Sequence, residues 1–180
     1  VGLVSTYPLM LDFYTGIPFD SYGGNTVYNR SGDQLQLMYW FWLVKENVLG
    51  NVPFDTNPFE FNPFVTTGLN TIPLAFIYFI FSPLGDVAAY NSTIISSYVL
   101  TGLFMYLLVK LYTGSRSGAL LAALIFTLVP YRIRGLAAGH GYALLFFCYP
   151  FILYYLERGI RSARIRYGIL SSMGLIFLAM

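Results

Sequence analysis

Two long stretches without a charged residue limit the fold of this chain more than any other feature. They are Val87–Val109 and Gly135–Leu156, and each is slightly longer than the ~20 residues with which a helix crosses the hydrocarbon core of a membrane. The chain is 57% hydrophobic and 10% charged over 180 residues, which is far more apolar than a soluble domain. The sequence therefore predicts an all-α, polytopic helical membrane protein.

A third apolar stretch, Ser117–Tyr131, is shorter and lies between Arg116 and Arg132. It crosses a membrane only if these arginines extend to the interface or the helix continues past Pro130. We predict spans at about 88–111, 117–131 and 141–157. Residues 1–11 are expected to end an earlier span and residues 167–180 to begin a further one, so the 180 residues form a single transmembrane domain cut from a longer protein.

The charges are distributed unevenly along the chain. Residues 1–90 hold seven acids and two bases, whereas residues 91–180 hold one acid and eight bases. Loops rich in Lys and Arg beside membrane spans stay in the cytoplasm, which places "LYTGSRSG" and "ERGIRSARIRY" inside. The link "YRIRGLAAGHGY" and the acidic segment 12–86 are then outside, and the protein is expected in the cytoplasmic membrane with this segment extracytoplasmic. Bases spread over such loops do not indicate nucleic-acid binding.

The apolar segment 72–84, "IPLAFIYFIFSPL", is predicted not to cross the membrane. If it crossed, the basic loop after residue 111 would move outside, against the charge rule. Its length instead fits an interfacial or re-entrant helix. The external segment 12–86 is therefore expected to carry a juxtamembrane helix at 32–49 and an interfacial helix at 72–84.

The helix expected at 32–49 follows turn-forming residues and carries Asp33 in its first turn, where the helix dipole favours a carboxylate. At about 100° per residue, Asp33, Gln36, Trp40 and Asn47 share one face. Amides bind hydroxyl groups and an indole can lie against the apolar face of a sugar, so this face suits a polyhydroxylated ligand. The other reading is that Asp33 only stabilises the helix start and that the aromatic residues form a membrane belt.

Two further groups of residues are candidates for the same site. Asp55 and Glu60, in "NVPFDTNPFEFNP", are either ordinary solvated acids or ligands that join Asp33 around a divalent cation such as Mg²⁺ or Mn²⁺. No spacing here is diagnostic of a metal. The predicted external link carries the basic residues, which could bind a phosphate on Asp33's side of the membrane or simply anchor the helices at the interface: Arg132, Arg134 and His140.

The order of motifs resembles the amino-terminal part of bacterial and archaeal membrane proteins of the C-type glycosyltransferase (GT-C) superfamily. The motifs are "TYPLMLDFYTGIP", "GDQLQLMYWFW", "NPFEFNP" and the string from "AAYNSTIISSYVL" through "TGSRSGALLAALIF" to "PYRIRGLAAGHGY". The resemblance covers nearly the whole chain. The chain differs from the family in two respects: its external loop is short, and no closely spaced pair of acids follows Asp33.

The resemblance implies transfer of a sugar from a polyprenyl-phosphate-linked donor to an acceptor outside the cytoplasm. Family members use an acid of the first external loop as base, and the matching acid is Asp33. Arg132 or Arg134, or a cation held with Asp55 or Glu60, would stabilise the leaving phosphate. The expected partners are this donor and membrane lipids. Two rival readings are a lipid or sugar transporter and a membrane assembly protein without catalysis. The fragment alone is not expected to be active.

Overall fold

The computed structural model describes residues 13–15, 17, 31–52, 72–137 and 139–179, and all regular structure in these residues is helical. The helices have the following bounds: α2 Ser31–Val48, α3 Ile72–Phe81, η2 Ser82–Leu84, α4 Asp86–Thr113, α5 Arg116–Thr127, α6 Pro130–Ala137, α7 Gly141–Leu144, η3 Leu145–Phe147, α8 Cys148–Ser162 and α9 Ile165–Ala179. The predicted all-α class is confirmed for the described part of the chain. The predicted end of a span at 1–11 lies outside it.

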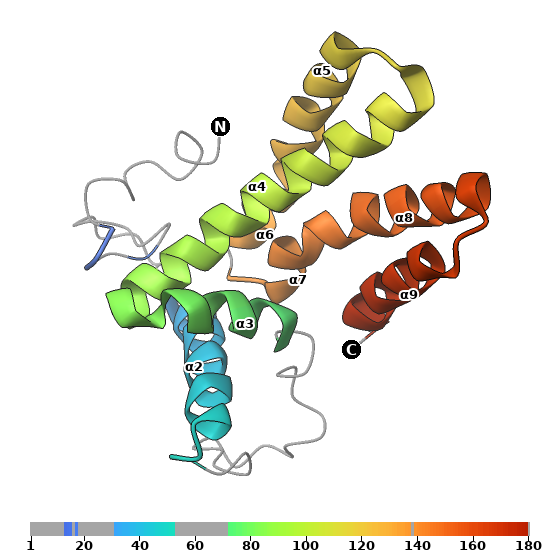
Figure 1. Cartoon of the computed structure of the whole chain (residues 1–180). Coiled ribbons are helices and arrows are strands. Elements are labelled where there is room, and N and C mark those ends of the chain that lie inside the picture. Colours follow the sequence, from blue (N-terminus) through green and yellow to red (C-terminus); the bar gives the residue numbers. More distant parts are fainter. Residues whose placement is uncertain (1–12, 16, 18–30, 53–71, 138, 180) are drawn as a thin grey trace.

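Helix α4 is the axis on which the other helices pack (Figure 1). Helices α2 and α3 lie at its amino-terminal end, α5 folds back along its carboxyl-terminal half, and α8 packs beside it with α9 against the far side of α8. The turn between α4 and α5 is closed by Gly114, whose φ of 69° is a left-handed conformation that glycine adopts readily. Ser115 then caps α5 by accepting a hydrogen bond from the Gly118 backbone N–H at 3.1 Å.

Two helical stretches are long and apolar enough to cross a membrane: Asp86–Thr113 and Gly141–Ser162. They match the predicted spans 88–111 and 141–157. The predicted span 117–131 is instead a bent pair of helices, because α5 ends at Thr127 and α6 begins at Pro130 with a 42° change of direction. Proline has no N–H to donate within a helix and is favoured at the first helical position, so Pro130 starts α6 rather than extending α5.

The segment predicted as interfacial forms α3 followed by the short 3-10 helix η2. Helix α3 has 10 residues, which is about half of what crossing the hydrocarbon core requires. Gly85, with a φ of 98°, ends this unit and turns the chain into α4. The predicted helix at 32–49 corresponds to α2, and the helix expected to begin at 167 begins as α9 at Ile165.

The two halves of α4 differ in burial. Ten of the eleven buried residues of α4 lie between Ala88 and Thr101, and only Leu108 is buried beyond them. The first half is covered because α2, α3 and the α6–α8 segment converge on it. The ring of Phe41 contacts both Tyr78 and Tyr90 there. The densest packing therefore surrounds the first half of α4.

Candidate functional site

Gln34 joins the start of α2 to the end of α6. Its side chain is buried, its amide Nε2 donates to the Leu136 carbonyl oxygen, and its Oε1 accepts from the Tyr90 hydroxyl. Donors and acceptors of a buried amide need such partners. The bonds fix the first turn of α2, which contains Asp33, against the segment that carries Arg134 and His140. The side chain of Asp33 lies outside what the structure describes.

Sequence reasoning missed Gln34, although it considered both of its neighbours. Helical phase placed Gln34 on neither the polar nor the apolar face that we predicted. The only signal was its position among apolar residues of an amphipathic stretch, where an amide is equally compatible with solvent and with a buried bond. Gln34 connects α2 to a residue 102 positions later, a pairing that local periodicity does not reveal.

The predicted polar face of α2 is wrong for Trp40. Trp40 is buried with Leu37, Phe41 and Val44, because burying a large aromatic side chain is strongly favourable. Its ring is therefore not presented to a ligand in this structure. Asn47 donates from Nδ2 to the Val52 carbonyl oxygen at 3.3 Å, and so closes the end of α2. Of the predicted ligand-binding residues on this helix, Gln36 is exposed as expected, whereas Leu35 of the predicted membrane face is also exposed.

Arg132 is completely buried, in contrast to its predicted place on an external surface. Its guanidinium donates from Nε to the Ala143 carbonyl oxygen at 3.2 Å, from Nη1 to the Thr127 carbonyl oxygen at 3.2 Å and from Nη2 to Ser97 Oγ at 2.9 Å. Its central carbon lies 4.0 Å from the centre of the Tyr98 ring. Arg132 makes no ion pair with a carboxylate of the described residues.

The break between α5 and α6 explains the position of Arg132. Carbonyl oxygens at the end of a helix have no partner within that helix, and buried ones must find a donor elsewhere. Thr127 ends α5, and Ala143 lies in the single turn of α7. The five N–H groups of an arginine can serve several carbonyls at once, so Arg132 binds both ends of this irregular segment to Ser97 of α4. This supports a structural role for Arg132.

Arg134 and His140 are exposed, as predicted, and they lie beside two tyrosines that sequence reasoning did not consider. The rings of Tyr131 and Tyr142 are stacked, with 5.6 Å between centroids and 27° between planes. His140 Nδ1 lies 3.1 Å from the Tyr142 hydroxyl. These four side chains form an exposed cluster, here called the tyrosine–basic cluster, at the junction of α6 and α7.

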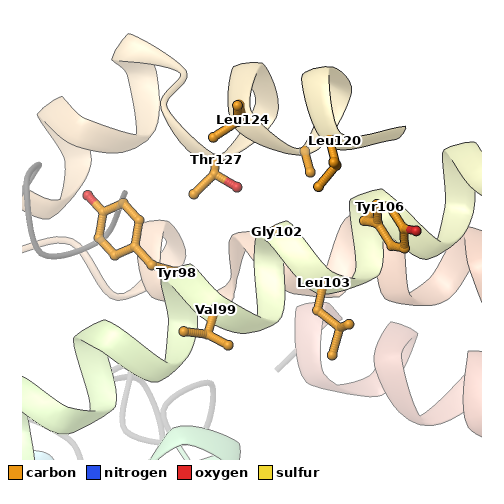
Figure 2. Close-up of a pocket in the computed structure, with 9 residues that line it drawn as sticks. Tyr98, Val99, Gly102, Leu103, Tyr106, Leu120, Leu124 and Thr127 are labelled. Atoms are coloured by element: carbon orange, nitrogen blue, oxygen red, sulfur yellow. The ribbon is translucent and has the colours of Figure 1, made fainter. Parts of the chain in front are cut away.

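A groove of about 390 Å³ lies between α4 and α5 (Figure 2). Gly102 lets the helices approach, since a Cβ added there would lie 3.3 Å from Thr127 Oγ1. The Tyr98 and Thr127 hydroxyls are buried and have no hydrogen-bond partner among the described residues. The other lining side chains are apolar or aromatic, which suits a hydrocarbon chain: Val99, Leu103, Tyr106, Leu120, Ala123 and Leu124.

An ionic cluster ties α2, α3 and α4 together at the amino-terminal end of α4. Lys45 Nζ lies 3.0 Å from Asp86 Oδ1 and 3.1 Å from Glu46 Oε1, and the Tyr78 hydroxyl donates to Asp86 Oδ1 at 2.6 Å. The Asn51 amide donates a hydrogen bond of 2.7 Å to Glu46 Oε2. This bond and the neighbouring Lys45 lower the pKa of Glu46. Burial opposes the charge of Lys45, yet its bonds to Asp86 and Glu46 raise its pKa. Every charge here is paired, which indicates a structural connection.

The described residues contain no group of three or more His, Cys, Asp or Glu side chains that could hold a metal ion. Asp55 and Glu60 lie outside these residues, so the predicted metal role stays a prediction. Cys148 is buried and unpaired, consistent with a small core residue.

The two basic loops meet at the other end of α4. Arg161 donates from Nη1 to the Leu111 carbonyl oxygen at 3.2 Å, and the Tyr112 hydroxyl donates to Glu157 at 2.9 Å. These contacts bring the carboxyl-terminal ends of α4 and α8 together. The Lys- and Arg-rich segments thus share one end of the helical bundle, an arrangement that agrees with the charge rule that placed both on one side of a membrane.

Comparison with protein-family models, with curated proteins and with solved structures found no match for this chain. The fold and the site therefore rest on the chain's own residues.

Proposed function

We propose that this chain is the amino-terminal part of a GT-C-like membrane glycosyltransferase. The enzyme transfers a sugar from a polyprenyl-phosphate-linked donor to an acceptor on the extracytoplasmic face, with Asp33 as base. The observation that carries the proposal is the pair of bonds made by Gln34, because they attach the turn bearing Asp33 to the segment bearing Arg134 and His140. The segment that contains Asp33 is thereby attached to the segment that contains Arg134 and His140.

The proposed reaction is a direct displacement at the anomeric carbon. The Asp33 carboxylate takes the proton of the acceptor hydroxyl, and the acceptor oxygen forms the new bond to the anomeric carbon. The bond from that carbon to the phosphate oxygen breaks, and its electron pair leaves on the polyprenyl phosphate, which inverts the anomeric configuration. Arg134 can pair with the phosphate, since a guanidinium binds phosphate oxygens in a fork geometry. Arg132 has no such role, because its donors are bonded inside the bundle.

The membrane character of the chain supports a lipid-linked donor. Two helices, or three if the bent pair counts as one span, are long and apolar enough to cross a membrane. The groove between α4 and α5 adds an apolar surface of the kind that a hydrocarbon chain occupies. The donor's sugar phosphate would then lie at the exposed end of α6, and its lipid would lie among the helices.

The test is sugar transfer by the complete gene product in lipid nanodiscs, with a panel of undecaprenyl-phosphate-linked hexoses and pentoses as donors. Asp33→Asn should lower kcat by at least about 100-fold, which is the scale of general base catalysis, and should leave donor binding intact. Glu46→Gln, the same carboxyl-to-amide change at the far end of α2, should retain activity within about two-fold. Undiminished transfer by Asp33→Asn would remove Asp33 as the base.

A lipid or sugar transporter is the second candidate, and the burial of Arg132 inside the bundle favours it. An ionisable residue within membrane-spanning helices is often functional. The same preparation separates the two functions: a transporter would move an intact labelled donor across a proteoliposome membrane, whereas a transferase would release polyprenyl phosphate. Movement of intact donor without release would replace the enzymatic proposal by this one.

Orientation can be tested separately, in a background in which buried Cys148 is replaced by Ala. Asn51 and Ser117 are exposed at opposite ends of the bundle. Asn51→Cys should react with a membrane-impermeant maleimide in intact cells, and Ser117→Cys only after permeabilisation. The reverse pattern would place the ends of α2 and α6 in the cytoplasm and contradict extracytoplasmic transfer.

A further inference from the structure

We propose that the tyrosine–basic cluster is a binding site for a sugar phosphate, with the sugar ring lying on Tyr131 and Tyr142 and the phosphate held by Arg134. The proposal deepens the proposed function and rests on it for the choice of ligand. It names two substrate-contacting residues, Tyr131 and Tyr142, that the sequence did not indicate.

The two tyrosines are exposed although they stack on each other. Tyr131 is 61% exposed and Tyr142 is 45% exposed. Stacking and the contact of Tyr142 with Gly135 hide part of the rings, so these values mean that the remaining ring surface is accessible. Aromatic rings of this kind offer an apolar surface with a polar hydroxyl at its edge. A sugar ring has the matching character, with C–H groups on its faces and hydroxyls around its rim.

The ring of Tyr142 is held in place by its neighbours. A Cβ added at Gly135 would lie 3.1 Å from the Tyr142 ring and 3.0 Å from Ala143 Cβ, so the absence of a side chain lets Tyr142 lie directly on α6. His140 also contacts Tyr142, with 5.2 Å between ring centroids. A ring fixed before binding loses little conformational entropy when a ligand arrives.

Arg134 supplies the charge at the right place. Tyr131, Arg134 and Gly135 are three and four positions apart on α6, and residues so spaced lie on one face of a helix. Arg134 therefore lies on the face of α6 that carries Tyr131. Tyr142 covers part of this face at Gly135. A guanidinium beside an aromatic surface fits a ligand with a sugar ring next to an anionic group.

The cluster also lies near the point where the first turn of α2 is attached to α6. Leu136, which follows Gly135, accepts the hydrogen bond of Gln34, and Gln34 follows Asp33 in α2. A sugar on the tyrosines would thus lie close to the attachment point of the turn that carries Asp33. The competing explanation is that both tyrosines only anchor the helices at a membrane interface, where Tyr is common.

Saturation-transfer NMR on the chain in lipid nanodiscs tests the proposal, with glucose 1-phosphate and mannose 1-phosphate as probes and inorganic phosphate as competitor. The double variant Tyr131→Ala/Tyr142→Ala should reduce the signal of the sugar ring protons on the order of five-fold or more, as loss of an aromatic contact surface predicts. Tyr131→Phe/Tyr142→Phe should retain most of it, because stacking requires the rings. Tyr149→Ala is the matched control, since Tyr149 is 50% exposed on α8 away from the cluster.

Arg134→Gln should abolish competition by inorganic phosphate and leave contact between the ring protons and the tyrosines detectable. A wild-type chain that is helical by circular dichroism but gives no sugar signal would overturn the proposal, as would a double Ala variant with an unchanged signal, which is the outcome for interfacial anchors. Asp33→Asn should bind the probes normally. Probe binding by a wild-type protein that transfers no sugar would remove the proposed function and keep this site, whereas transfer unaffected by the double Ala variant would do the reverse.

Discussion

Arg132 and Arg161 show how differently the two ends of the same helical bundle accommodate a cation. Arg132 is buried at the break between α5 and α6 and is bonded to two backbone carbonyls and one hydroxyl. Arg161 is 48% exposed and lies 2.6 Å from Glu157, with Leu111 and Tyr112 close by. The exposed arginine has a carboxylate partner, whereas the buried one relies on the acceptors that an interrupted helix leaves open. In this fold, the carbonyl oxygens of the irregular backbone accept the hydrogen bonds of the buried guanidinium, and the guanidinium supplies the donors that these carbonyls lack.

Arg132→Met should have the largest effect on stability. It leaves the Thr127 and Ala143 carbonyls and Ser97 Oγ without their donor, and each buried acceptor left without a hydrogen bond costs about 1–3 kcal/mol. Reversible unfolding in mixed micelles would measure the loss. Arg132→Lys should also be destabilised, because one ammonium cannot reach all three acceptors. An unchanged unfolding free energy in both variants would contradict a structural role for this residue.

Ser97→Ala should have the next largest effect within the same region. Ser97 Oγ donates to the Leu144 carbonyl oxygen and accepts from Arg132, and leaving buried groups unsatisfied costs about 1–3 kcal/mol. Thr101→Ala is the control, because the hydroxyl of Thr101 donates to the Ser97 carbonyl oxygen of its own helix, at 2.7 Å, and bonds to no other helix among the described residues. Equal losses in the two variants would mean that the link between helices contributes nothing.

Ser115→Ala tests the exposed turn between α4 and α5, at the end that carries the basic loops. Loss of the cap on the Gly118 N–H should destabilise the hairpin by about 1 kcal/mol. Ser117→Ala, two residues later in the same exposed first turn, should be close to neutral. The difference in unfolding free energy between the two variants measures the contribution of the Ser115 cap. A larger loss for Ser117→Ala would contradict a stabilising role for that cap.

Arg161→Ala should have the smallest effect. Ion pairs at exposed positions contribute about 0–1 kcal/mol, and the loss should shrink further in high salt because the charges are screened. Unfolding of wild type and variant at low and high salt measures it. A salt-independent loss as large as that of Arg132→Met would erase the distinction between the two arginines.

The coarse fold could be predicted from the sequence because its signals are local. Charge-free length predicts the crossing helices, and Gly85, Gly114 and Pro130 mark the places where the chain turns. The short length of 72–84 indicated a helix that does not cross, and α3 has that length. Each of these signals is carried by neighbouring residues, so no knowledge of the packing was needed.

The predictions that failed depend on which helices pack together. Trp40 was placed on a polar face by helical phase, but its side chain is buried in the structure. Arg132 was placed in an external link because the charge rule put the two flanking basic loops inside, and only the tertiary position of the Thr127 and Ala143 carbonyls explains its burial. Tyr131 and Tyr142 are separated by ten residues in the chain, and a bent connection brings their rings together.

The bonds of Arg132 also bear on the order in which the chain enters a membrane. An isolated helix with a central arginine is inserted at a cost of about 2.5–3.5 kcal/mol, and the α5–α6 segment carries Arg132 beyond its own break. Its acceptor Ser97 belongs to α4, which is synthesised earlier, whereas Ala143 is synthesised later. We therefore expect Arg132 to bond first to Ser97 of α4, as the α5–α6 segment emerges from the ribosome. Its bond to the Ala143 carbonyl oxygen of α7 forms only after that helix has been made.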